Sequence, residues 1–218
     1  MAFIVFEGGE GTGKSTQMRL LGEWLGSKNV QCVRTREPGG TPLAEEVRAL
    51  FKAVPAHGDI PTPQTELLLV MAARAQHVRK NIEPSLNSGS WVLCDRFLDS
   101  SYVYQGIRAG VAKSDIDTVA EIALGKVFPD LTLVLHVSRD EARKRVTSRG
   151  NAAADRLDSE NEAVHDVISE GFLRLLREQT PWFRGKVPLR VFVDASGTVA
   201  EIQDRVRLIV SQNFGISL

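Results

Sequence analysis

Short apolar runs alternate with longer segments of helical spacing along the chain. The runs, which are apolar or β-branched, lie at residues 3–6, 31–35, 91–95, 131–137 and 190–193. Apolar residues recur with the period of a helix in residues 14–25, 43–51, 64–86, 115–124, 139–149, 163–183 and 199–210. This alternation predicts an α/β fold, in which helices cover both faces of a five-stranded parallel sheet. Such doubly wound sheets bind ligands beyond the carboxyl ends of their strands.

The connections between these segments predict a single domain over residues 1–218. Glycine, proline and alanine gather at residues 37–42, 57–63 and 150–154, but none of these stretches is long enough to separate domains. With 218 residues, 43% of them hydrophobic, the chain can bury a full core without disulfides or a structural metal. Cys32 and Cys94 each lie in an apolar run, which favours buried thiols in strands over a disulfide or a metal pair.

The charges exclude one class of partner. Lysine plus arginine and aspartate plus glutamate both number 27, so the chain has no excess positive charge with which to bind duplex DNA. The first residues lack a basic segment, and no stretch approaches eighteen apolar residues, so neither a signal peptide nor a membrane span is expected. We therefore predict a cytoplasmic protein with small-molecule partners and no nucleic acid or membrane partner.

A glycine-rich loop follows the first apolar run and precedes a helical segment. Gly8, Gly13, Lys14 and Ser15 satisfy the G-x-x-x-x-G-K-S/T pattern of the P-loop, in the strand-to-helix context that the pattern requires. Glycines let successive N–H groups point at phosphate oxygens, and the helix adds its positive N-terminal end. The residues expected to hold ATP are Gly8, Gly9, Glu10, Gly11, Thr12, Gly13, Lys14, Ser15 and Thr16. The loop thus predicts the P-loop NTPase fold.

Within this loop, Lys14 is expected to neutralise charge on the β- and γ-phosphates, and Ser15 to coordinate magnesium. A P-loop does not name the acceptor, because GTPases, motors, transporters and small-molecule kinases all contain one. The chain has neither an N-K-x-D guanine-reading motif nor an L-S-G-G-Q transporter signature. A small-molecule kinase is the class that remains.

A second set of charges follows the next two predicted strands. Arg36 follows the second strand, and Asp95 and Arg96 close the third, so all three emerge at the edge that holds the P-loop. Arginine binds phosphate oxygens bidentately, and therefore Arg36 and Arg96 are candidates to hold an acceptor phosphate opposite the γ-phosphate of ATP. Asp95 is a candidate to hold a magnesium-bound water. Taken singly, either arginine is better explained by a surface ion pair; together, at the ends of neighbouring strands, the two favour a phosphate site.

These residues resemble the thymidylate kinase family, whose members phosphorylate dTMP to dTDP with ATP and magnesium, in the synthesis of dTTP. The resemblance runs nearly end to end. It depends on E-G-G-E-G-T-G-K-S-T at 7–16, on T-R-E-P-G-G-T at 35–41, and on D-R-F at 95–97 followed by S-S at 100–101 and Y-Q-G at 104–106. The R-E-P-G-G-T segment is the most diagnostic of these.

The resemblance implies a set of substrate contacts. Arg36 and Arg96 are expected to hold the dTMP phosphate, with Arg96 also catalytic, and Arg74 to meet the thymine ring. Tyr104 is expected near the deoxyribose, as a barrier to a ribose 2′-hydroxyl. The resemblance also places Glu10, Ser101 and Gln105 in the substrate site.

A lid with a catalytic arginine is implied for residues 145–157, as in bacterial members of the family. Arg145, Arg149 and Arg156 flank a run of glycine and small residues, which suits a loop that closes over the transferring phosphoryl group. The acidic Glu10 fits this subclass, because it leaves the cationic task to the lid; an exposed residue in a turn is its simpler interpretation. Arg149 and Arg156 are the predicted catalytic arginines of the lid.

One position departs from the family pattern. An aromatic residue commonly lies four positions before the arginine that matches Arg74, where it stacks on thymine, and here that position is Val70. Stacking of a base on an aromatic ring contributes about 1–3 kcal/mol. Either another ring takes over this contact, or the base is discriminated less strongly.

Other functions remain open. A deoxynucleoside kinase would need a carboxylate base in place of the phosphate-binding Arg36 and Arg96, and a P-loop regulatory protein would bind nucleotide without transferring phosphate. The family implies a homodimer; the helix at 64–86 suits an interface or a buried core helix equally well.

Overall fold

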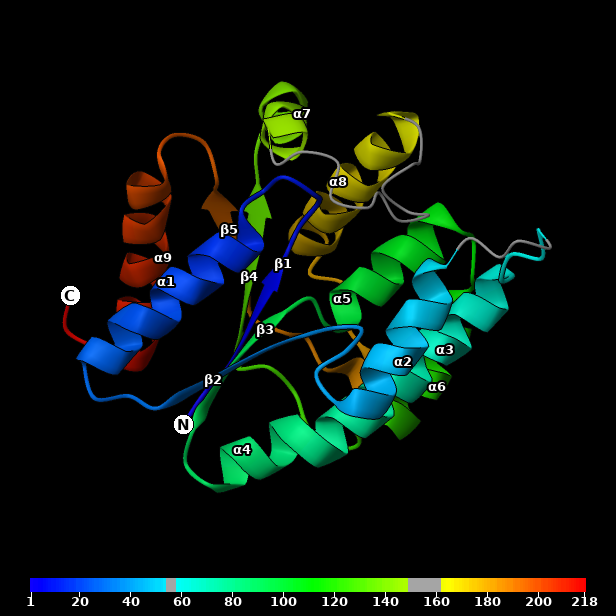
Figure 1. Cartoon of the computed structure of the whole chain (residues 1–218), viewed down its shortest axis with the longest axis horizontal. Helices are drawn as coiled ribbons and strands as arrows, with labels where there is room; N and C mark the ends of the chain where they lie inside the picture. Colours follow the sequence, from blue (N-terminus) through cyan, green and yellow to red (C-terminus); the bar gives the residue numbers. More distant parts are fainter. Residues whose placement is uncertain (54–57, 149–161) are drawn as a thin grey trace.

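The computed structural model describes residues 1–53, 58–148 and 162–218. Within these ranges the chain forms the predicted five-stranded parallel sheet with helices on both faces (Figure 1). Its strands are β1 (Phe3–Glu7), β2 (Cys32–Arg36), β3 (Trp91–Asp95), β4 (Leu131–His136) and β5 (Arg190–Asp194). They lie in the order β2-β3-β1-β4-β5, so β1 is central and the connections run outward from it in both directions.

Alternate residues of β1 point into two different cores. Phe3 and Val5 belong to one buried cluster, whereas Ile4 and Phe6 belong to the other. A strand that is buried on both faces has no polar side, which explains why the sequence shows a continuous apolar run there.

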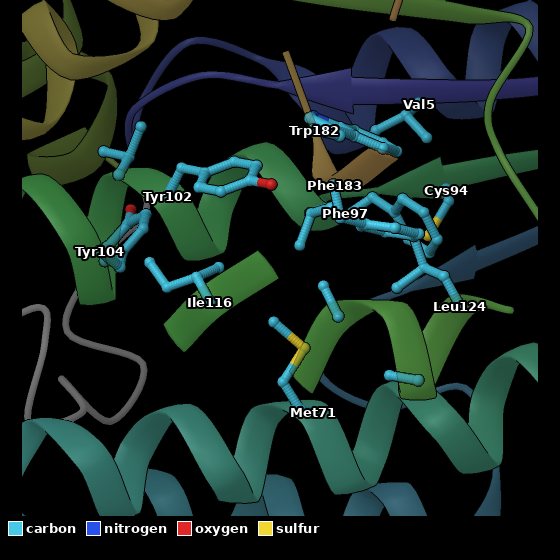
Figure 2. Close-up of a cluster of buried hydrophobic side chains, with 14 of the residues drawn as sticks. Val5, Met71, Cys94, Phe97, Tyr102, Tyr104, Ile116, Leu124, Trp182 and Phe183 are labelled. Carbon is cyan, nitrogen blue, oxygen red and sulfur yellow. The ribbon is translucent and has the colours of Figure 1, made fainter. Parts of the chain in front are cut away.

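More helices pack on one face of the sheet than on the other. The helices are α1 (Lys14–Ser27), α2 (Pro42–Lys52), α3 (Pro63–His77), α4 (Glu83–Asn87), α5 (Leu98–Ser101), α6 (Lys113–Leu124), α7 (Arg139–Ser148), α8 (Glu162–Arg177) and α9 (Val199–Phe214). Helices α1 and α9 pack side by side on one face (Figure 1). Helices α3, α5, α6 and α8 enclose the core on the other face, which contains Met71, Phe97, Tyr102 and Trp182 (Figure 2).

The strand register brings the predicted charges to one edge. Asp95 of β3 is paired with Phe6 of β1 on one side and with Arg36 of β2 on the other. Glu7, which ends β1, therefore lies next to the turn that contains Arg96. Three neighbouring strands end together, as the sequence predicted for a ligand-binding edge.

Two helices begin with the same dipeptide, Thr-Pro. The Thr41 side chain accepts a hydrogen bond from the N–H of Ala44 at the start of α2, and that of Thr62 accepts one from Thr65 at the start of α3. Proline at the first helical position removes an N–H group that no helical carbonyl would accept. The segments predicted at 43–51 and 64–86 begin one residue after these prolines.

The segment at 64–86 is helical throughout but not uniformly α. A π turn, η1 (Val78–Ile82), separates α3 from α4 and ends two residues before Pro84. Proline lacks the N–H and crowds the preceding turn, and a wider turn relieves both constraints.

Two helical predictions need correction. The segment at 163–183 ends as a helix at Arg177; Gln179 adopts a left-handed φ of 47°, and Pro181 disfavours helix in the residue before it. Residues 98–108 form α5 and the π turn η2 (Tyr102–Arg108), which periodicity did not predict. In the first segment the apolar spacing continues past the end of the helix; in the second, the π turn departs from the 3.6-residue period.

The two cysteines are free thiols in strands β2 and β3. Cys94 is buried as predicted, whereas Cys32 is only partly buried. Among the described residues, no helix is long and apolar enough to cross a membrane.

Candidate active site

The phosphate loop joins β1 to α1, and two of its glycines are required by space as well as by conformation. Gly8 has a φ of 137°, and a Cβ atom there would collide with the Leu135 carbonyl oxygen. Gly11 has a φ of 71°, and a Cβ atom there would collide with the backbone of Ala142. The loop is thus packed against β4 and α7 with no room for a side chain at these positions.

Lys14 is the first residue of α1, and its side chain turns back into the phosphate loop. Its Nζ donates to the carbonyl oxygens of Gly8 and Gly9, at 3.0 and 2.7 Å. Burial, with a smaller contribution from Arg96, lowers the pKa of Lys14 to about 8. A phosphate in the loop would give this buried ammonium a negatively charged partner and would therefore raise the pKa of Lys14 again.

Ser15 and Asp95 form a pair with the chemistry of a magnesium site. The Ser15 hydroxyl donates to Asp95 Oδ2 at 2.6 Å, and Asp95 Oδ1 is buried with no hydrogen-bond partner among the described residues. Within the described ranges, no group of three or more histidine, cysteine or acidic side chains is placed to hold a metal ion. Magnesium often binds to one or two protein oxygens together with substrate phosphates, so this hydroxyl–carboxylate pair fits the ion.

Arg96 extends from the turn after β3 toward the phosphate loop. Its Nη1 donates to the Gly8 carbonyl and to Ser100 Oγ, both at 3.3 Å. The guanidinium carbon lies 5.0 Å from the centroid of the Tyr104 ring. The backbone of Arg96 has a φ of 70°, which is uncommon for a residue other than glycine and needs support from its surroundings.

Arg74 of α3 is buried, and its guanidinium is held on three sides. Its Nε lies 2.5 Å from Glu37 Oε2, Nη1 donates to Ser101 Oγ at 2.9 Å, and Nη2 donates to the Phe97 carbonyl at 2.9 Å. The same group lies over the Phe97 ring, at 5.3 Å from its centroid. This arginine is fixed in place before any ligand arrives.

The carboxylate of Glu37 is shared between Arg74 and His77. Glu37 Oε1 lies 3.0 Å from Nδ1 of His77, whose Nε2 lies 2.7 Å from Thr35 Oγ1. Burial alone would raise the pKa of Glu37, but Arg74 and His77 outweigh it and hold that pKa below its usual value. Glu37 is therefore an ionised, buried partner that orients Arg74.

The predicted substrate residues all line one cavity. They are Glu10, Arg36, Arg74, Arg96, Ser101, Tyr104 and Gln105. Arg36 lies at the rim, where its side chain is 54% exposed and pairs with Glu45 of α2 at 2.9 Å. The cavity thus joins an exposed cation to buried ones, beside the phosphate loop.

The cavity also contains residues that sequence reasoning did not assign. Arg48 and Lys52 line it from α2, and Ser100 lines it from α5. Positions 45, 48 and 52 share one face of a helix, which is a signal that the sequence contained.

Glu7, which lies outside the cavity lining, was also left without a role. The sequence shows it as a carboxylate at the end of an otherwise apolar strand. It is fully buried, and burial, together with the negative charge of Asp99, raises its pKa to about 7.

Val70 forms part of the cavity wall where an aromatic residue was expected. It is 6% exposed. Of the described residues that line the cavity, Phe97 and Tyr104 have aromatic rings, and each of these rings already packs against an arginine.

Of the three lid arginines, only Arg145 lies within the described residues. It lies in the last turn of α7, pairs with Glu141, and donates to the Gly197 carbonyl at 3.3 Å in the loop after β5. Arg149 and Arg156 lie outside the described residues, as does most of the predicted lid.

Comparisons with known proteins agree with each other. A family model described as "Thymidylate kinase" matches residues 6–203. The chain is 43% identical over 204 residues to the thymidylate kinase of Marinomonas sp. (strain MWYL1), covering 94% of this chain and 91% of that protein. It is 42% identical over 211 residues to the thymidylate kinase of Symbiobacterium thermophilum, covering 96% and 92%. The crystal structure of thymidylate kinase from Ehrlichia chaffeensis matches with a TM-score of 0.69 and 30% identity, covering 96% of this chain and 98% of that one.

Proposed function

The chain belongs to the thymidylate kinase family, and from this premise we propose that it transfers the γ-phosphoryl group of ATP to dTMP, forming dTDP for dTTP synthesis. One observation supports the proposal most directly. The phosphate loop and a cavity lined by Arg36, Arg74 and Arg96 lie at the same edge of the sheet. A P-loop enzyme whose acceptor is itself a phosphate needs this combination of charges.

On the donor side, we propose that residues 8–16 hold the phosphates of ATP. Lys14 is buried within the loop and close to the carbonyl oxygens that a phosphate would replace as its partners. Ser15 and Asp95 would hold Mg²⁺, which neutralises charge on the donor phosphates when it is bound.

On the acceptor side, the proposed roles follow the positions of the side chains. Arg96 and Arg36 would hold the dTMP phosphate, and Tyr104, packed beneath Arg96, would adjoin the sugar. Arg74, Ser101 and Gln105 lie deeper and would contact the base. No general base is needed, because the attacking phosphate oxygen of dTMP is already ionised.

The lid is the third part of the proposal. Arg149 and Arg156 would bring positive charge to the transferring group when residues 145–157 close, and closure would exclude water. Glu10, which lines the acceptor cavity, is an acidic P-loop residue consistent with a cation supplied from the lid.

We also propose a homodimer and a cytoplasmic location. Leu43 and Leu50 of α2, Leu68 of α3 and Ile122 of α6 are more than half exposed. These helices pack in succession, α2 on α3 and α3 on α6, so a second copy of the chain has an apolar surface to cover. The proposed substrates, ATP and dTMP, are intracellular metabolites, which supports the location.

A panel of acceptors tests the proposed reaction. Purified protein with ATP and magnesium is expected to form a diphosphate from dTMP faster than from dUMP, UMP, dGMP or AMP, and to leave thymidine unphosphorylated. Activity on thymidine without activity on dTMP would support a deoxynucleoside kinase instead. ATP binding without transfer to any acceptor would support a regulatory nucleotide-binding protein.

A further inference from the structure

We propose that Glu7 and Ser100 form a positioning relay that holds Arg96 against the phosphate loop. The proposal rests on the proposed function, because the purpose of the relay is to present Arg96 to the acceptor phosphate. Both residues lie within the quoted motifs, but no substrate or metal contact has been assigned to either.

Glu7 closes the turn that contains Arg96. Its Oε1 accepts hydrogen bonds from the backbone N–H groups of Phe97 and Ser100, at 2.8 and 3.0 Å. Its Oε2 accepts one from the Ser100 hydroxyl at 2.6 Å. All three donors lie in the segment that follows Arg96, so one carboxylate from β1 fixes the path of the chain after β3.

Ser100 connects this carboxylate to the arginine. Its hydroxyl donates to Glu7 and accepts a hydrogen bond from Arg96 Nη1 at 3.3 Å. A hydroxyl has one donor and two acceptor sites, so the Ser100 hydroxyl can donate to the Glu7 carboxylate oxygen while it accepts from a donor-only guanidinium. The order of the relay is therefore Glu7, Ser100, Arg96.

The backbone of Arg96 needs this support. Its φ of 70° is left-handed, a conformation that persists only where the neighbours impose it. On one side the N–H of Arg96 donates to the Phe6 carbonyl at 2.9 Å. On the other side, Phe97 is anchored in the core beneath the sheet, edge-on to Phe3 at 5.0 Å between ring centroids (Figure 2).

The relay also sets the distance between the two halves of the site. The Gly8 carbonyl oxygen accepts from Lys14 Nζ at 3.0 Å and from Arg96 Nη1 at 3.3 Å. Lys14, proposed for the donor phosphates, and Arg96, proposed for the acceptor phosphate, thus donate to the same carbonyl oxygen. A displacement of Arg96 would change the alignment of the reacting groups as well as the affinity for dTMP.

Ser100→Ala tests the relay without removing a buried charge. It is expected to weaken dTMP binding about tenfold in calorimetric titrations, the typical effect of one hydrogen bond to a charged group. Thymidine binding should not change, because thymidine has no phosphate for Arg96 to hold. Ser100→Thr keeps the hydroxyl and should restore dTMP binding. Thr132→Val is the matched control, since the Thr132 hydroxyl is buried in β4 and has no hydrogen-bond partner among the described residues.

A second variant tests dependence on Arg96 itself. If Ser100 acts through the arginine, Ser100→Ala should have no further effect on the dTMP KM in an Arg96→Lys background, while the ATP KM stays within about twofold of its parent. An equal effect in both backgrounds, or an equal loss of dTMP and thymidine binding, would overturn the relay. Glu7→Gln should mimic Ser100→Ala; if it fails to fold, the Ser100 variants still decide the question. A wild-type protein that binds neither dTMP nor thymidine would contradict the proposed function, and the relay with it.

Discussion

At the scale of single residues, two buried carboxylates support the site and have opposite properties: Glu37 lines the cavity, and Glu7 lies behind Ser100, which lines it. Glu37 lies between Arg74 and His77, and its pKa is held below the usual value. Glu7 receives its hydrogen bonds from two backbone N–H groups and one hydroxyl, and burial raises its pKa to about 7. The difference lies in the partners: a cation in direct contact outweighs burial, whereas neutral donors do not.

This property of Glu7 predicts how stability depends on pH. In the unfolded chain the carboxyl titrates near its ordinary 4.5, so between that pH and about 7 the folded state binds more protons than the unfolded state. The free energy of unfolding contributed by this group therefore falls as pH rises through that window. Glu7→Gln cannot ionise, and relative to it the wild-type protein should lose about 1–3 kcal/mol between pH 5 and pH 8 in urea denaturation. A pH-independent difference between the two proteins would contradict the prediction.

Replacing Val70 with an aromatic residue is expected to strengthen dTMP binding. It lies one helical turn before Arg74 on the same face of α3, and both residues line the cavity. Val70→Phe would add a ring for a base to stack on, a contact that contributes about 1–3 kcal/mol. We expect up to about tenfold lower KM for dTMP and a larger preference for dTMP over dUMP and UMP. Val167→Phe, on the half-exposed surface of α8, is the control, and an unchanged KM in Val70→Phe would contradict the role assigned to this wall.

The sequence indicated the charged residues of the site better than the residues that hold them. The P-loop, Arg36, Asp95 and Arg96 lie at or just after the ends of strands that share one edge, and strand order in a doubly wound sheet brings such positions together. Glu7 and Ser100 lie in the quoted motifs without an assigned role, and His77 lies in none, because their roles depend on contacts between segments more than forty residues apart. Such contacts require the tertiary structure.

At the scale of elements, periodicity predicted the long helices and failed on irregular ones. Helices α1, α6 and α9 each bury one face, and the sequence shows that face. The π turn η2, which contains Tyr104 and Gln105, widens the helix by one residue per turn and so breaks the period that was sought. At 178–183 the apolar pattern continues because Trp182 and Phe183 are buried, but they reach the core from a loop and a 3₁₀ turn.

The proposed lid arginines should affect kcat and dTMP affinity to different extents. An arginine that meets the transferring phosphoryl group acts mainly in the transition state, so Arg149→Ala or Arg156→Ala should lower kcat far more than dTMP affinity. Arginines in this role contribute about 10³–10⁵ in rate, and a loss of about 10³ is expected for the dominant one. Arg174→Ala is the control, because Arg174 is 57% exposed and paired only with Glu178 at 2.9 Å among the interactions described for its side chain. Losses confined to the Michaelis constant would contradict the lid assignment.

At the scale of the whole molecule, the two cores have different tasks. The core between the sheet and α1 with α9 contains Ile4 and Phe6 of β1, the strand that leads into the phosphate loop, and Leu21 of α1, the helix that follows the loop. The core on the other face surrounds the acceptor side: Phe97, Tyr104 and Met71 belong to it, and so does the aromatic group around Trp182 (Figure 2). The acceptor cavity is therefore formed by side chains that also pack the protein, and its shape is coupled to the stability of that face.

The outer surface of that same face predicts the oligomeric state. Leu68 of α3 and Ile122 of α6 are 58% and 75% exposed, and leaving large apolar side chains in water is unfavourable unless a partner covers them. If a second copy does so, Leu68→Glu or Ile122→Glu would place an unpaired charge in the interface, at a cost large enough to dissociate a dimer. Sedimentation velocity should then show the mass of two chains for the wild-type protein and of one chain for either variant. Leu208→Glu, on the opposite face in α9, should remain a dimer. A wild-type protein that sediments as a single chain at micromolar concentration would contradict the dimer, and because every residue assigned to the cavity here comes from one chain, it would leave the proposed reaction untouched.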